Sequence, residues 1–166
     1  RAGIIHILRH NLRNGHTCLP YEKLVSASEN HFFDRKSARL APKDLAPHLS
    51  AFANASGGLI VLGIEDDGAI SGVSDEKENT FRKVPLDFLQ ILPEYEIEMV
   101  PCQLDSGETG KLMLFHIFPS ANEIIKLKIG EAFLRVGDSS RKLNSEQLLA
   151  LEYSKGIKSY ESRIVD

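Results

Sequence analysis

Residues 50–68, SAFANASGGLIVLGIEDDG, contain the change of periodicity that decides how this chain folds. Before the paired glycines, apolar residues recur at helical spacing and predict a helix over residues 44–55. Asp44 suits its N-cap, and Pro47 would then fall in the first turn, where no backbone donor is needed. After the glycines, the aliphatic run at 59–64 is typical of a strand buried on both faces. The stretch predicts a helix, a glycine turn and a buried strand, in that order.

Gly57 and Gly58 raise the question of a phosphate-binding loop. Such a loop needs its glycines between the end of a strand and the start of a helix, where free N–H groups and the positive end of the helix dipole meet the anion. Here the helix comes first, and neither GxGxxG nor GK[ST] follows. We therefore favour a helix stop, with a glycine in the left-handed conformation and close packing of helix on strand.

Glu65, Asp66 and Asp67 leave the predicted buried strand and enter a turn. Carboxylates in such a place either bind a divalent cation or solvate the turn and accept backbone hydrogen bonds. Three adjacent side chains cannot all face one ion, because side chains alternate along an extended backbone. A metal site would need further carboxylates, and Glu29 and Asp34 are the natural candidates. The residues alone favour the turn.

The rest of the chain predicts helices mixed with strands that mostly form hairpins. Helices are predicted at residues 3–12, at 79–92 with a break near Pro85, and at 145–156 with Asn144 or Ser145 as the N-cap. Strands are predicted at 29–40, 69–73, 96–104, 111–118 and 131–136, with hairpin turns at Asp67-Gly68 and at 106–110. This order favours an α+β domain with a mixed, largely antiparallel sheet flanked by helices over an alternating doubly wound sheet.

The composition is that of a soluble globular domain, with 166 residues of which 42% are hydrophobic and 26% charged. No segment approaches the ~18 consecutive apolar residues that a membrane span requires. The N-terminal segment does not resemble a signal peptide, because His, Arg and Asn interrupt its apolar stretch. Cys18 and Cys102 are far apart and form no CxxC motif. We expect two reduced thiols in a cytoplasmic protein.

The formal net charge of −3 is unevenly distributed. Residues 1–43 carry eight Lys or Arg against three acidic residues, whereas the remaining residues carry twelve against twenty. This predicts either a basic face on an acidic domain or solvated charges with no partner. Arg135, Arg141 and Lys142 present the same choice between contacts to a phosphate backbone and ordinary surface charge. His31, beside two phenylalanines, is interpreted as a partly buried side chain and not as a catalytic base.

Three stretches together resemble the Schlafen-type AlbA-like domain of bacterial and archaeal transcriptional regulators and ATPase-like proteins. They are FFDRKSARL at 32–40, AFANASGGLIVLGIEDDGAISGV at 51–73 and AFLRVGDSSRKLNSEQL at 132–148. The most specific pattern is AFAN followed by GG, a hydrophobic strand, G[IV]xDDG and a further glycine. The resemblance implies a cytoplasmic α+β domain that binds DNA, usually N-terminal to a winged-helix or ATPase-like region. Because the glycines follow the helix instead of preceding it, they do not support ATP binding by this domain.

The resemblance also implies a second possible activity. In animal Schlafens, the similar domain is an endoribonuclease with an acidic triad, which carries over onto Glu29, Asp34 and Asp66. Asp34 is shorter than the Glu of that pattern. Animal Schlafens clamp RNA between two tandem lobes, so a homodimer of this chain would be needed to imitate them.

We therefore predict one domain over residues 1–156, with a tail at 157–166 that leads to a missing C-terminal domain. Its first predicted function is to bind nucleic acid, DNA before RNA, as a module of a larger transcriptional regulator or ATPase-like protein. No cofactor is required, and a membrane is not a predicted partner. Six basic side chains are predicted to contact phosphates: Arg35, Lys36, Arg39, Arg135, Arg141 and Lys142.

Two alternatives remain at this point. One is an endoribonuclease in which Glu29, Asp34 and Asp66 hold Mg²⁺ or Mn²⁺ and Lys36 steadies the scissile phosphate. The other is a non-catalytic domain that regulates the C-terminal domain of the same chain. A homodimer is a possible assembly in each case.

Overall fold

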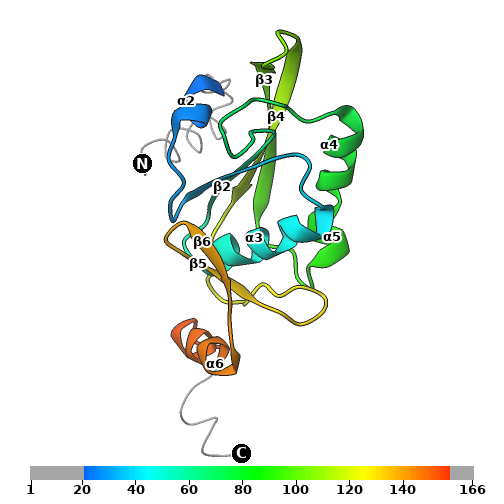
Figure 1. Cartoon of the computed structure of the whole chain (residues 1–166). Coiled ribbons are helices and arrows are strands. Elements are labelled where there is room, and N and C mark those ends of the chain that lie inside the picture. The colour runs from blue at the N-terminus through cyan, green and yellow to red at the C-terminus, as the bar shows by residue number, and fades with distance from the viewer. Residues whose placement is uncertain (1–20, 158–166) are drawn as a thin grey trace, which may run out of the picture.

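A four-stranded sheet forms the centre of the molecule in the computed structural model, which describes residues 21–157 (Figure 1). Its strands lie in the order β1-β2-β4-β3; β1 is parallel to β2, and the other neighbours are antiparallel. A separate antiparallel hairpin is formed by β5 and β6. The strands are β1 Phe33–Lys36, β2 Gly58–Leu62, β3 Tyr95–Gln103, β4 Thr109–Ile117, β5 Phe133–Val136 and β6 Ser139–Lys142. The predicted α+β fold with a largely antiparallel sheet is confirmed.

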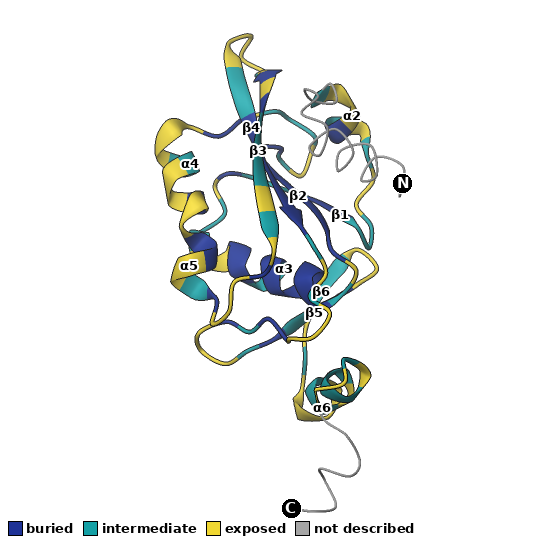
Figure 2. Cartoon of the chain, turned by 180° about the vertical axis from the view of Figure 1, so that it is seen from behind, coloured by how far each residue is buried: buried dark blue, intermediate teal, exposed yellow. Residues whose placement is uncertain are grey.

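Helices cover the two faces of this sheet unequally. They are α2 Tyr21–Ser26, α3 Pro42–Asn54, α4 Asp75–Arg82, α5 Val84–Phe88 and α6 Ser145–Ser154. The α3 helix packs against one face and also contacts the β5–β6 hairpin, whereas α2 lies on the other face. In Figure 2 the buried colour is concentrated on α3 and the central strands, and α4 and α6 are mainly exposed or half-buried. The helix predicted at 3–12 and Cys18 lie outside the described residues.

Alternation along β2 divides the core between the two faces. Leu59 joins the cluster around Leu24 of α2, and Ile60 joins the cluster around Phe52 of α3. All five residues of β2 are buried. The aliphatic run after the glycines therefore forms the doubly buried strand that its composition predicts.

The two glycines at the start of β2 act as the sequence predicts. Gly57 has φ 74°, and its N–H donates to the carbonyl of Phe52 at 2.9 Å, which ends α3. A Cβ on Gly58 would lie 2.5 Å from the ring of Phe52 and 2.6 Å from the carbonyl oxygen of Phe32. One glycine stops the helix, and the other lets the helix approach the strand closely.

The start of α3 differs from the prediction. The helix begins at Pro42 with Ala41 as its N-cap, and Asp44 lies in the first turn. Proline is well suited to the first helical position, because its fixed φ matches the helix and its missing N–H has no partner there. Pro47 consequently lies inside the helix and not in its first turn.

Local hydrogen bonds explain why the strands predicted at 29–40 and 69–73 are shorter in the structure. Asn30 Oδ1 accepts from the N–H of Phe32 at 2.7 Å and holds a turn there, so the strand predicted at 29–40 is limited to β1. In the predicted strand at 69–73, only Ile70 forms a bridge, with Ile64. The N–H groups of Ser71 and Gly72 both donate to one carbonyl, that of Gly63, which interrupts a regular ladder.

The remaining elements follow the sequence closely. The break near Pro85 separates α4 from α5, although α4 begins earlier than predicted, at Asp75. β3, β4 and β5 lie within a few residues of their predicted ranges. Asn144 caps α6 in a capping box with Gln147. The strand β6, which follows a tight turn at Gly137, was not predicted from the sequence.

Candidate nucleic-acid interface

A buried ion pair joins β1 to the β5–β6 hairpin. Arg135 Nη1 lies 3.1 Å from Asp34 Oδ2, and both residues are only 1% exposed. Asp34 points toward α3 because it alternates with Phe33, which packs on the α2 side. A buried carboxylate is costly unless a cation and further donors compensate its charge. Arg135 supplies that charge from a distant part of the sequence.

The remaining contacts of Arg135 fix its guanidinium group in place. Nε and Nη2 donate to the carbonyl of Asn30 at 3.2 and 3.0 Å, and Nη2 also donates to the carbonyl of Phe33 at 3.3 Å. The guanidinium carbon lies 4.6 Å from the centre of the Phe52 ring, at cation–π distance. Arg135 thus connects the turn before β1, the strand itself and α3.

Three further side chains surround the same carboxylate. Lys36 Nζ lies 3.4 Å from Asp34 Oδ2, and His48 Nδ1 lies 3.7 Å from the same oxygen. Ser140 Oγ accepts from Arg135 Nη1 at 3.2 Å and is 2.8 Å from His48 Nδ1. We call these five residues the Asp34 cluster: Asp34, Lys36, His48, Arg135 and Ser140.

The electrostatics of the Asp34 cluster favour neutral histidine. Burial lowers the pKa of His48 to about 4, and the nearby cations Lys36 and Arg135 contribute to the decrease, against the opposite influence of Asp34 and Asp44. At neutral pH the imidazole is therefore uncharged, and it joins α3 to β6 without adding a third cation.

The carboxyl group of Glu29 lies near the Asp34 cluster. Burial and the neighbouring charge of Asp34 raise its pKa, while Lys36 and Arg35 act in the opposite direction. Asp34 Oδ1 is buried and accepts no hydrogen bond within the described part of the chain. Asp34 is thus engaged through one oxygen, by side chains that stabilise its charge.

Four predicted phosphate-binding residues lie at the surface. Lys36 is partly exposed, Arg39 is exposed after the end of β1, and Arg141 and Lys142 are exposed on β6. Two have acidic neighbours: Arg39 Nε is 3.8 Å from Glu65 Oε1, and Lys142 Nζ is 3.3 Å from Glu131 Oε2. We use the name basic surface for these four cations: Lys36, Arg39, Arg141 and Lys142. As adjacent residues of β6, Arg141 and Lys142 point to opposite faces of the hairpin.

The other two predicted phosphate-binding residues are turned into the fold. Arg135 is buried in the Asp34 cluster, so its guanidinium group is not available to a phosphate backbone. Arg35 lies on the α2 side of β1 and donates to the carbonyl of Val25. Both side chains form contacts within the fold, and both residues are left out of the basic surface.

The three carboxylates of the alternative triad do not form a metal-binding group. Among residues 21–157, no three acidic, histidine or cysteine side chains gather in such an arrangement. Glu29 and Asp34 influence each other electrostatically, whereas Asp66 is exposed in the turn after β2.

The acidic turn has a local structural role. Asp67 Oδ1 accepts from the N–H of Ala69 at 2.9 Å, and Glu65 Oε1 accepts from Ser71 Oγ at 2.8 Å. Side-chain hydrogen bonds from Ser37 and Ser71 lower the pKa of Glu65. These contacts confirm the turn interpretation for Glu65 and Asp67.

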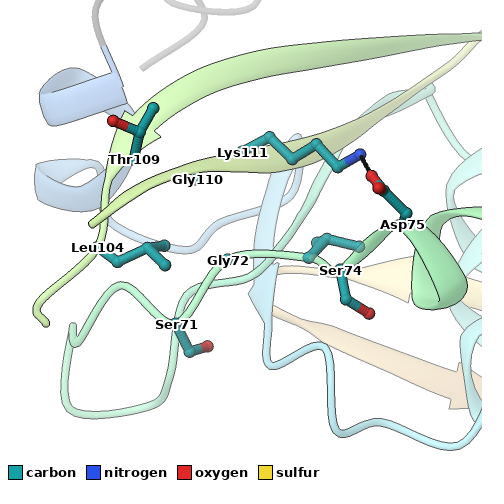
Figure 3. A pocket seen from close by; sticks show the side chains of 9 residues that line it. Ser71, Gly72, Ser74, Asp75, Leu104, Thr109, Gly110 and Lys111 are labelled. Atoms are coloured by element: carbon teal, nitrogen blue, oxygen red, sulfur yellow. Dashed lines mark hydrogen bonds and ion pairs between the residues drawn. The ribbon is translucent and has the colours of Figure 1, made fainter.

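A hollow of about 420 Å³ lies between β4 and the start of α4 (Figure 3). Ser71, Ser74 and Thr109 provide hydroxyl groups around it. Its cation, Lys111, forms ion pairs with Asp75 and with Glu78, the latter at 2.7 Å. Because two carboxylates already compensate this lysine, the hollow has no excess of positive charge to attract a phosphate.

Sequence reasoning missed His48 and Ser140. His48 lies on α3 within a run of buried residues, with no motif to distinguish it. Ser140 pairs with Arg135 across the β5–β6 hairpin. The signal that would have found it is the glycine turn: with Gly137 at the tip, φ 61°, the register places Ser140 opposite Arg135. His31 packs edge-on against Phe32, as the sequence indicated for a partly buried histidine.

Comparison with known families identifies the domain. The family model described as Schlafen, AlbA_2 matches residues 29–144, a range that contains the whole Asp34 cluster and the whole basic surface. The chain belongs to the Schlafen AlbA_2 family. This AlbA_2 domain matches no curated protein. Within residues 21–157, no helix has the length and apolar character needed to cross a bilayer.

A solved structure supports the fold of this AlbA_2 domain. The DIP2311 protein from Corynebacterium diphtheriae is similar over 81% of this chain, with a TM-score of 0.53 and 19% identity. The match covers 27% of the DIP2311 chain, so the present chain corresponds to about a quarter of that protein. At this identity the similarity concerns the fold alone.

Proposed function

We propose that this AlbA_2 domain binds nucleic acid, DNA in the first place, through its basic surface. The observation that carries the proposal is the buried Asp34–Arg135 pair, which joins β1, with the partly exposed Lys36, to the β5–β6 hairpin, with the exposed Arg141. Lys36 lies on β1 beside Asp34, and Arg141 follows Ser140 on β6. Membership of the AlbA_2 family, which connects the domain with nucleic-acid-related functions, supports the same conclusion.

The buried Arg135 holds in place the two elements that carry Lys36 and Arg141. A phosphate-binding surface is effective when its cations are held in register with the backbone they contact. The contacts between Arg135 and the carbonyls of Asn30 and Phe33 hold the hairpin against β1, so Lys36 and Arg141 keep a fixed separation. Arg39 follows the end of β1 and Lys142 is the last residue of β6. Each has an acidic neighbour, Glu65 and Glu131 respectively, so each adds less positive charge than Arg141.

Contacts of this kind predict binding that depends on salt more than on sequence. Lysine and arginine displace counterions from phosphates, and they do not read base edges unless they enter a groove. The chain carries a net charge of −3, so its overall charge does not attract a polyanion and any attraction is local. We propose moderate affinity with little preference among sequences.

The role of the domain in a larger protein is a second part of the proposal. The region of DIP2311 that matches this domain is 27% of that chain, which supports a module that works beside other domains. We propose that such neighbours belong to a transcriptional regulator or an ATPase-like protein, and that the AlbA_2 domain brings them to nucleic acid.

The proposal is tested by fluorescence anisotropy with labelled duplex DNA, single-stranded DNA and RNA of the same sequence. The test variant is Arg141→Glu/Lys142→Glu. The matched control is Lys77→Glu/Lys83→Glu on the α4–α5 segment, which changes the net charge equally. We expect the test variant to lose about tenfold or more in affinity, because two phosphate contacts become repulsive, and the control to lose much less.

Two results would count against this proposal. Equal affinities of wild type and the Arg141→Glu/Lys142→Glu variant would remove β6 from the interface. Equal losses in the test and control variants would show that only the net charge matters. Tighter binding to RNA than to duplex DNA would keep the surface and change the preferred nucleic acid.

A further inference from the structure

Among residues 21–157, the β5–β6 hairpin pairs with no strand of the four-stranded sheet. The position of Arg141 relative to Lys36 on β1 therefore depends on side chains that contact the hairpin. Arg135 makes one such contact, with Asp34 and the carbonyls near it. The α3 helix makes a second contact through two polar side chains that are buried in the fold, Ser50 and Asn54.

The backbone of Phe133 on β5 is bonded to both of these side chains. Its N–H donates to Ser50 Oγ at 3.1 Å, and its carbonyl accepts from Asn54 Nδ2 at 2.9 Å. The bond from Leu143 N–H to the Ala132 carbonyl places the next residue, Phe133, where its backbone groups point away from β6. Ser50 and Asn54, one helical turn apart, thus take the place of a neighbouring strand.

Asn54, the last residue of the AFAN pattern, also holds the segment that leads to the hairpin. Its Oδ1 accepts from Ile125 N–H at 2.7 Å, and its Nδ2 donates to the Ile125 carbonyl at 2.9 Å. Ser50 Oγ donates to the same carbonyl at 2.7 Å. A buried amide group whose donors and acceptor are all engaged has one orientation, so it fixes both segments to the same turn of α3.

We propose that Asn54, with Ser50, is a positioning residue for nucleic-acid binding, because it holds β5 against α3 and so sets the place of Arg141. This inference rests on the proposed function of the basic surface. Arg141 pairs with Leu134, the residue after Phe133, so a displacement of β5 moves β6 with it. Asn54 is only 3% exposed, and it acts without touching the ligand.

Hydrogen exchange read by mass spectrometry tests this placement without nucleic acid. The test variant is Asn54→Asp, which keeps the size and the acceptor of the side chain but removes the donor to Phe133 and Ile125. The matched control is Val100→Ala, which removes buried methyl groups on the α2 side of the sheet. In the test variant alone, residues 131–143 should exchange about tenfold or more faster relative to β2. Equal protection of this segment in wild type and Asn54→Asp would overturn the placement.

Fluorescence anisotropy with labelled duplex DNA tests whether the placement matters for binding. At a temperature where circular dichroism shows each variant folded, the affinity should fall about fivefold or more for Asn54→Asp and stay unchanged for Val100→Ala. The loss caused by Arg141→Ala should be about threefold or more smaller in the Asn54→Asp background than in wild type, because both changes affect the same contact. Additive losses, or an equal loss in Val100→Ala, would overturn the proposal.

Ser50→Ala provides a milder second variant if Asn54→Asp does not fold. It removes only the hydroxyl group that bonds Phe133 and Ile125, and alanine favours the helix. Exchange and affinity should change in the same direction as for Asn54→Asp. Faster exchange with unchanged affinity would leave a structural role alone and overturn the positioning role. If wild type binds no nucleic acid, the proposed function fails, whereas the exchange result still decides whether Asn54 places the hairpin.

Discussion

Arg135 and Arg141 lie on one hairpin and belong to opposite environments. Arg135 faces α3 and β1, where it is buried and bonded to Asp34 and to backbone carbonyls. Arg141 pairs with Leu134 on the other face of the hairpin and is exposed. Strand alternation alone separates them. The comparison shows that arginines grouped by sequence can divide into one that builds the fold and one that is free to meet a ligand.

The largest expected effect tests the buried side of this comparison. Replacing Arg135 by Met leaves Asp34 buried without its main cation, and such a loss typically costs about 3–5 kcal/mol. Chemical denaturation should show this decrease in the free energy of unfolding. The matched variant Arg141→Met should change it by about 0.5 kcal/mol or less. Similar losses in both variants would remove the distinction between the two arginines.

The pH dependence of stability provides a smaller effect. The pKa of His48 is about 4 in the folded chain against an ordinary value of 6.5, so the unfolded state binds more protons between these values. The contribution of His48 is therefore complete above pH 6.5 and is lost as the pH falls toward 4, by up to about 3 kcal/mol.

The variant His48→Gln isolates this contribution, because it removes the titration of the imidazole and leaves the carboxylates in place. The free energy of unfolding of wild type should fall more steeply than that of the variant between pH 6.5 and 4. Parallel curves for the two proteins would contradict a buried, neutral His48.

A single hydroxyl group on the hairpin should have the smallest effect on stability. Ser140 Oγ contacts both Arg135 and His48, so Ser140→Ala should cost about 1 kcal/mol. Ser139 is adjacent, and among the side-chain hydrogen bonds of the described residues its hydroxyl forms only an exposed contact with Asp138. Ser139→Ala should therefore have little effect when both variants are compared with wild type by thermal unfolding. The reverse order of the two losses would place the hairpin in a different register.

The sequence predicted those helices and strands whose formation depends on residues close together in the chain. The change of period around Gly57 and Gly58 predicted α3 and β2, and the SGETG turn predicted the β3–β4 hairpin. Both depend on neighbours in the chain, so the pattern contains the necessary information.

The Asp34 cluster could not be predicted in the same way. The sequence alone makes Asp34 a candidate metal ligand and Arg135 a candidate phosphate contact, because each residue alone has the chemistry for that role. Their pairing depends on how the β5–β6 hairpin packs across α3 and β1, which no local pattern in the sequence describes. The distribution of buried and exposed cations is therefore a property of tertiary structure.

The central claim is that the cations of the basic surface bind nucleic acid, while the buried Arg135 holds the β5–β6 hairpin against β1. It is tested most directly by the slope of log K against log salt for duplex DNA. Each lost phosphate contact should lower the magnitude of that slope by about 1. We predict this change for Arg141→Ala and none for Lys83→Ala on the α4–α5 segment. An unchanged slope for Arg141→Ala, or an equal change for Lys83→Ala, would contradict the claim.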